Sequence, residues 1–241
     1  MFGRGIKLFR LFGIQVELHW TFLLALVLWG VLGRFGFAAN LLLGLTVFGS
    51  VLVHELGHSL VAMRRQVRIA GIELHFFGGV AKMVDLPRNP RDEIAIAAAG
   101  PLTSLGLAVL AGTSWWLTGL APLAWVAQVN LTLAIFNLLP ALPMDGGRIF
   151  RAALQTRLGG LRATRIASTV ARGFAVAIAV LGLFTDPFLV LLAVLLWTMA
   201  GQERRLAEWR HLEATGLPQV KIVFRDAFGR TMVVEDIGQR W

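Results

Sequence analysis

Long apolar stretches separated by short charged segments dominate this sequence and restrict the folds that are open to it. Of the residues, 56% are hydrophobic and only 15% are charged, whereas a typical soluble domain carries about 25% charged residues. The stretches have about the length that a helix needs to cross a bilayer. The sequence therefore predicts an all-α polytopic membrane protein with about six transmembrane helices, at roughly residues 18–32, 38–63, 92–112, 120–139, 165–184 and 187–201.

Lysine and arginine are distributed unevenly among the segments that join these helices. With six spans, four segments lie on one side of the membrane and hold 21 of the 23 basic residues: the N-terminus, residues 64–91, residues 148–165 and the tail from Arg204. Basic residues accumulate on the cytoplasmic side, so both termini are predicted to be cytoplasmic. The net charge of +9 then follows from topology, and we expect the lipid bilayer, and no nucleic acid, as a partner. The predicted location is the plasma membrane of a prokaryote.

Three segments lack the character of membrane helices. Residues 64–91 contain strand-forming residues around Gly78-Gly79, which predicts a small membrane-associated β-hairpin region between the second and third helices. The N-terminal residues alternate loosely and predict a short strand or an interfacial segment. The end of the chain predicts one further hairpin. We therefore expect a transmembrane domain over residues 1–210 and a short cytoplasmic tail over residues 211–241.

The second predicted helix contains the motif H-E-L-G-H, which comprises His54, Glu55 and His58. Residues four apart lie on one face of a helix, so the two imidazoles are placed to bind one zinc ion, and Glu55 to activate its water. Ionisable groups are costly inside a membrane, which favours a functional role over chance occurrence. The chain has no cysteine, so a metal must be held by His, Asp, Glu or Asn.

A second motif, N-L-L-P-A-L-P-M-D-G-G at residues 137–147, follows the fourth predicted helix. Its prolines end the helix and its glycines permit tight turns, so Asp145 can point back into the protein. A catalytic zinc commonly has three protein ligands and one position for water, which makes Asp145 the candidate third ligand beside His54 and His58. The alternative is that Asp145 caps a short helix that starts at Gly147. With six spans, both motifs reach similar depth near the cytoplasmic surface.

Together the two motifs resemble those of the site-2 protease family of intramembrane zinc proteases. The resemblance rests on His54 to His58 within one helix and on residues 137–147 after another. It extends to Gly100-Pro101 and to Phe76-Phe77-Gly78-Gly79, and it covers roughly residues 5–210. The paired motifs, in this order and at this separation, are far more specific than either motif alone.

The resemblance implies a zinc metalloendopeptidase that carries out intramembrane proteolysis, cleaving transmembrane segments of other membrane proteins. One Zn²⁺ per chain would be bound by His54, His58 and Asp145. Glu55 would be the general base, and Asn137 would lie beside the metal and donate a hydrogen bond to the developing oxyanion. The sequence therefore predicts metal ligands at three positions and catalytic residues at two.

Three other functions fit parts of the sequence less well. A catalytically silent membrane protein that binds client transmembrane helices is the main alternative, and the intact Glu55 argues against it. A metal transporter needs polar ligands along a pathway, and the sequence has one cluster near one face. A different class of membrane zinc protease takes a later glutamate as third ligand, but Glu203, Glu208 and Glu213 lie beyond the last predicted span.

Two further histidines and the predicted hairpin carry weaker predictions. His19 lies beside Trp20 at the start of the first helix, as a membrane-surface anchor or as a residue near the site. His75 belongs to the predicted hairpin. Because residues 67–84 form strands with a free edge, an extended substrate is expected to pair with this hairpin by strand addition.

Overall fold

The structure is a computed structural model that describes residues 5–33, 35–75, 78–214, 222–225 and 231–234. In these residues it contains seven helices: α1 (Trp20–Leu32), α2 (Phe37–Arg64), α3 (Pro90–Thr118), α4 (Ala121–Asn137), α5 (Asp145–Leu158), α6 (Gly160–Phe184) and α7 (Pro187–Ala214). The strands are β1 (Ile6–Leu11), β2 (Ile14–Leu18), β3 (Ile69–His75), β4 (Gly78–Met83), β5 (Ile222–Arg225) and β6 (Thr231–Val234). Phe76 and Phe77, which contributed to the family resemblance, lie outside the described residues.

All six apolar helices occur close to their predicted positions. Three of them, α2, α3 and α6, are long and apolar enough to cross a membrane. Helices α1 and α4 are apolar but shorter, and the second half of α7 is rich in charged residues. Length and composition therefore support three spans, and the larger count of about six stays a prediction.

The β structure predicted between the second and third helices is part of a larger sheet that includes the N-terminal residues, for which a short strand was one of two predictions. A four-stranded sheet has the order β1-β2-β3-β4, and its first two strands come from the N-terminus. Strands β1 and β2 form a hairpin whose turn places Phe12 at φ 50° and Gly13 at φ 82°, a conformation that glycine adopts readily. Strand β2 then pairs in parallel with β3. The alternation that suggested a strand in the N-terminal residues is thus explained by pairing with a segment about 55 residues away.

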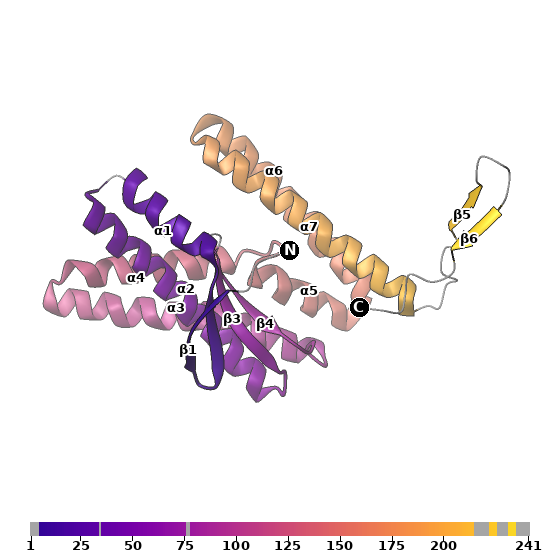
Figure 1. Cartoon of the computed structure of the whole chain (residues 1–241), viewed down its shortest axis with the longest axis horizontal. Helices are drawn as coiled ribbons and strands as arrows, with labels where there is room; N and C mark the ends of the chain where they lie inside the picture. The colour runs from indigo at the N-terminus through magenta and orange to yellow at the C-terminus, as the bar shows by residue number, and fades with distance from the viewer. Residues whose placement is uncertain (1–4, 34, 76–77, 215–221, 226–230, 235–241) are drawn as a thin grey trace.

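One face of this sheet packs against α2, the helix that carries the H-E-L-G-H motif (Figure 1). The core between them is apolar and consists of Ile14, Phe22, Ala25, Phe48, Leu56, Ile72 and Leu74. Lys82 forms ion pairs with both Glu17 and Glu73 in the same sheet. Because successive strand residues point to opposite faces, residues 72 and 74 face α2 and residue 73 faces away.

Three other helices pack against α3. Helix α3 packs against α2, α4 and α5, while α6 and α7 form a hairpin that extends away from α1–α4 in Figure 1. Asn130 on α4 donates from Nδ2 to Ser50 Oγ on α2 over 2.8 Å, a hydrogen bond that links the two helices. The tail contains the antiparallel pair β5–β6, in agreement with the predicted hairpin.

Candidate metal centre

Helix α2 brings His54 and His58 together on one face, as the spacing predicts. Both residues are only 4% exposed. Their Nε2 atoms lie 3.1 Å apart, and their rings meet edge to face with centroids 4.8 Å apart. Two imidazole nitrogens are therefore directed at one point inside the protein.

Asp145 approaches this point from α5. Its Oδ2 atom lies 3.2 Å from His54 Nε2 and 3.0 Å from His58 Nε2. Helix α5 begins at Asp145 itself, and the residue at the N-cap position is Met144. The structure therefore contradicts the alternative that Asp145 caps a helix starting at Gly147. Instead, its carboxylate is directed towards the two histidines, which lie about 90 residues earlier in the chain.

The other nitrogen of each ring is held by α3. His58 Nδ1 lies 2.7 Å from the Ile96 carbonyl oxygen and His54 Nδ1 lies 3.0 Å from Ser104 Oγ. A carbonyl can only accept, so His58 carries a proton on Nδ1, and Nε2 is the ring nitrogen directed at the centre. Such outer partners fix the tautomer and orientation of metal-ligating histidines. Sequence reasoning missed both residues, and Ser104, a polar side chain within a long apolar helix, was the only available signal.

Gly100 allows α3 to approach the two rings closely. A Cβ atom at this position would lie 2.2 Å from His58 Nε2 and 2.6 Å from His54 Nε2. Any side chain would therefore collide with the atoms that face the centre. The resemblance included Gly100, but the sequence did not show what this residue contacts.

The donor set fits a zinc ion. Zinc with bonds of about 2.0–2.1 Å to nitrogen or oxygen separates its ligands by about 3.3 Å in tetrahedral geometry. The three separations among His54, His58 and Asp145 are 3.0, 3.1 and 3.2 Å. Three protein ligands leave a fourth position for water, which is typical of catalytic zinc sites.

Glu55 lies beside these ligands, next to strand β4. One of its carboxylate oxygens is within 4.8 Å of a ligand nitrogen of His54 and of His58. On its other side, a Cβ atom at Gly79 would lie 2.7 Å from Glu55 Cγ and 3.0 Å from Val51 Cγ1. Strand β4 therefore passes directly over the catalytic candidate, and only glycine at position 79 permits this close approach.

Asn137 is not brought into contact with the three ligands by any of the described interactions. It is the last residue of α4, and its Nδ2 atom donates to the Leu133 carbonyl over 2.9 Å. The role of Asn137 as an oxyanion donor stays a prediction, because no described contact joins its amide to the three ligands.

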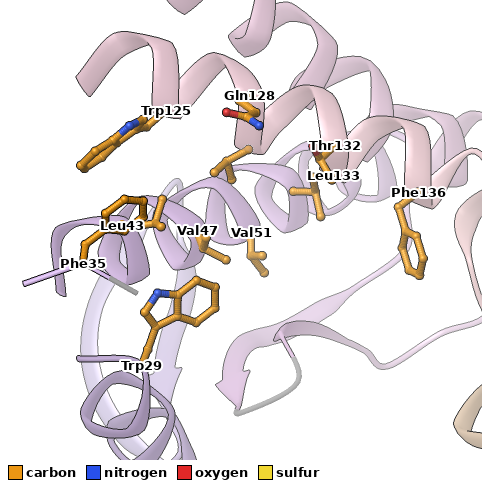
Figure 2. Close-up of a pocket in the computed structure, with 11 residues that line it drawn as sticks. Trp29, Phe35, Leu43, Val47, Val51, Trp125, Gln128, Thr132, Leu133 and Phe136 are labelled. Atoms are coloured by element: carbon orange, nitrogen blue, oxygen red, sulfur yellow. The ribbon is translucent and has the colours of Figure 1, made fainter. Parts of the chain in front are cut away.

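A cavity of about 550 Å³ lies next to the centre, between α1, α2 and α4. Figure 2 shows Leu43, Val47 and Val51 following one another along α2, opposite side chains of α4, with Trp29 of α1 nearby. The lining is almost wholly apolar, with Gln128 and Thr132 as its polar members. The cavity reaches Val51, one helical turn before Glu55.

Comparisons with known proteins agree with this geometry. The sequence profile of peptidase family M50 matches residues 42–119 and 111–181. A zinc metalloprotease of Methanocaldococcus jannaschii is 38% identical over 213 residues, which cover 85% of this chain and 62% of that protein. Putative zinc metalloproteases of Mycobacterium tuberculosis and Synechocystis are each 36% identical, and the matches cover 51% and 53% of their lengths. This chain thus spans about half to three-fifths of the length of these relatives.

A solved structure is similar as well. The site-2 protease from Methanocaldococcus jannaschii superposes with a TM-score of 0.65 at 36% identity, covering 83% of this chain and 95% of that one. The matched profile covers more than half of the chain and includes both motifs. As the paired motifs predicted, this chain belongs to peptidase family M50, the site-2 protease family, whose relatives are named zinc metalloproteases.

Proposed function

We propose that this protein is an intramembrane zinc metalloprotease that cleaves transmembrane segments of other membrane proteins. The observation that carries the proposal is the convergence of His54, His58 and Asp145 within 3.2 Å of one another, with Glu55 beside them. Few roles other than hydrolysis need a carboxylate next to a three-ligand metal site with an open position.

In this proposal His54 Nε2, His58 Nε2 and Asp145 Oδ2 hold one zinc ion. When bound, zinc lowers the pKa of a coordinated water from about 15.7 towards 7 and polarises the carbonyl under attack. Glu55 removes the proton from the attacking water, and the water oxygen bonds to the carbonyl carbon. As the C–N bond breaks, Glu55 gives the proton to the leaving nitrogen. Asn137 donates an amide N–H to the developing oxyanion.

The substrate backbone is proposed to pair with β4. This strand is the edge of the four-stranded sheet, so its outer side is open to another strand. Gly79 lies against Glu55, so a strand added here would run beside the catalytic carboxylate. A peptide bond within a helix is shielded by the hydrogen bonds of that helix and must be exposed before attack. Pairing with β4 unwinds the substrate helix and exposes the bond. The apolar cavity between α1, α2 and α4 is suited to the part of the substrate that remains in the membrane.

The proposed orientation places the centre near the cytoplasmic face of a prokaryotic plasma membrane. Helix α2 carries His58 close to its charged end at Arg64 and Arg65, and Arg65 pairs with Asp92 at the start of α3 over 3.0 Å. The distribution of basic residues supports six spans with both termini in the cytoplasm. The relatives named above come from bacteria and an archaeon. We retain residues 1–210 as the membrane domain and residues 211–241 as the tail.

The test is cleavage of a panel of tagged single-span membrane proteins by the purified full chain in detergent. Wild type, Glu55→Gln and a chelator-treated sample are compared, with bound zinc measured in each by elemental mass spectrometry. We expect cleavage by wild type only, with zinc retained in Glu55→Gln. Full cleavage by Glu55→Gln would refute the mechanism. Stoichiometric zinc and client binding without any cleavage would favour the silent binder instead.

A further inference from the structure

A second cluster of potential metal ligands lies on the sheet, apart from the candidate metal centre. His19, Glu73 and His75 each offer one ligand atom, and these three atoms lie within 4.8 Å of one another. The cluster involves two histidines that the proposed protease mechanism does not use. It combines two imidazoles with one carboxylate, a ligand set that zinc also accepts in enzymes.

Parallel pairing of β2 with β3 creates the cluster. Leu18 pairs with Leu74, and His19 continues the strand direction by donating its backbone N–H to the Leu74 carbonyl over 2.9 Å. His19 is therefore beside His75, and their ring centroids lie 4.9 Å apart. Glu73 precedes His75 by two residues, so both point to the sheet face opposite Leu74. Leu74 packs in the core against α2, which places the cluster on the far side of the sheet from Glu55.

His19 has an unusual environment that points to a ligand. The residue is only 4% exposed, and its Nδ1 atom lies 2.8 Å from Thr21 Oγ1. Its Nε2 atom is buried and has no hydrogen-bond partner among the described residues. Buried polar atoms are almost always paired, so an unpaired imidazole nitrogen requires an explanation. His19 Nδ1 also accepts from the Thr21 backbone N–H over 3.3 Å, as the N-cap of α1. Metal binding would move the ring proton to Nδ1, where Thr21 Oγ1 can accept it, and free the Nε2 lone pair, the arrangement that a metal-ligating histidine adopts.

The charges around the cluster favour a cation. Lys82 Nζ lies 2.5 Å from Glu73 Oε2 and 2.9 Å from Glu17 Oε2, so one ammonium is shared by two carboxylates. Two carboxylates and one ammonium leave one unit of negative charge beside the imidazoles.

We propose that His19, Glu73 and His75 form a second binding site for a divalent transition-metal ion such as Zn²⁺. His19 binds through Nε2, and His75 Nε2 lies 3.6 Å from the Glu73 carboxylate, so small side-chain rotations bring the three ligands to coordination distance. When the ion binds, the ion pair between Lys82 and Glu73 breaks and the ion pair between Lys82 and Glu17 remains. The bound ion ties the start of α1 to β3 and so steadies the β3–β4 hairpin, whose Gly79 borders Glu55.

The competing explanation is an ion-pair network in which Lys82 is the permanent counter-ion. The two explanations differ in the effect of Lys82→Gln. As a counter-ion, Lys82 stabilises Glu73, and its removal has no effect on metal binding. As a competitor, its removal exposes the carboxylate and is expected to tighten binding roughly tenfold, because one nearby charge shifts ionic equilibria by about one logarithmic unit or more.

The experiment is equilibrium dialysis of the purified full chain in detergent against buffered Zn²⁺, followed by elemental analysis. A His54→Ala/His58→Ala variant removes the candidate metal centre and isolates the second cluster. We expect about two zinc ions per wild-type chain and about one in this double variant. Adding His75→Gln to the double variant removes the last ion, whereas adding His211→Gln, at a histidine on α7, leaves it bound. The visible absorption of bound Co²⁺ checks independently that imidazole coordinates the metal.

The two proposals fail in different ways. A double variant that binds no zinc or cobalt, with unchanged helical circular dichroism, overturns the second site and leaves the protease proposal untouched. Retention of the remaining ion after both His75→Gln and Glu73→Gln also overturns it. If wild type and the double variant bind equal amounts of zinc, the proposal that His54 and His58 bind zinc is refuted. That result does not decide the proposal for the second cluster. Lys82→Gln must tighten zinc binding, and unchanged or weaker binding would favour the ion-pair network.

Discussion

Replacing Gly100 by alanine tests the central geometry most directly, because it adds one methyl group where α3 faces the two histidines. The new Cβ would lie 2.2 Å from His58 Nε2 and 2.6 Å from His54 Nε2, against 3.4–4 Å for an ordinary contact. The His58 ring would have to retreat by about 1.2 Å, far more than the tolerance of about 0.2 Å for a metal–ligand distance. The substitution therefore disrupts coordination without removing any ligand.

The expected effect is a loss of zinc and of cleavage in a protein that still folds. Alanine is a better helix former than glycine by about 1 kcal/mol, which offsets part of an overpacking cost of about 1–3 kcal/mol. Loss of an outer partner alone weakens metal binding by about 10–100-fold, and displacement of a ligand by about 1 Å exceeds that. A misplacement of this size also lowers turnover by about a hundredfold or more.

The assay measures bound zinc, cleavage rate and thermal unfolding of Gly100→Ala beside the matched control Gly106→Ala. Gly106 lies in the same helix, and a Cβ there would have no neighbour within 4 Å. The control is expected to keep zinc and activity and to unfold at an equal or slightly higher temperature. If Gly100→Ala keeps stoichiometric zinc and cleaves within tenfold of wild type, the inferred contact between α3 and the ligands is wrong.

Two of the three further predictions concern the surroundings of the centre, and the third concerns an ion pair beside the sheet. Gly79→Val crowds Glu55, since even a Cβ would lie 2.7 Å from Glu55 Cγ, and we expect cleavage to fall at least about tenfold with zinc retained. Ser104→Ala removes the partner of one ligand ring, and titration with a zinc chelator should show about 10–100-fold weaker binding; unchanged affinity would contradict this. Arg68 donates to Asp85 and holds its pKa at about 2, so this contact persists at neutral pH and is lost only as pH falls towards 2. In Arg68→Gln, a carboxyl NMR titration should show the pKa of Asp85 near about 3.9; a value still near 2 would contradict the assignment.

The predicted positions of the helices agree with the structure because apolar length is a local property. A run of about twenty apolar residues favours a helix whatever surrounds it, and the ends at Arg64 and Asn137 follow from local charge and proline. The number of spans is a different matter. It depends on how short helices such as α1 and α4 sit in the bilayer, which neighbouring helices decide.

The sheet was only half predicted, for a reason of sequence distance. Turn and strand residues between α2 and α3 indicated β3 and β4 as a local hairpin. The parallel partner β2 lies across two helices, and a single short alternating segment does not specify its partner. The cluster of His19 and His75 depends on that pairing, so sequence reasoning assigned these two residues separately.

By itself, the sequence determined that the chain is a membrane protein with two metal-binding motifs, because hydropathy and four-residue spacing act within single elements. It also indicated Asp145 as the third ligand, since few other carboxylates lie at the right depth. Only the tertiary structure decided that α3 orients both rings through Ile96 and Ser104, and that β4 runs over Glu55. These contacts depend on how closely packed helices and strands approach each other, and no local pattern in the sequence encodes such distances.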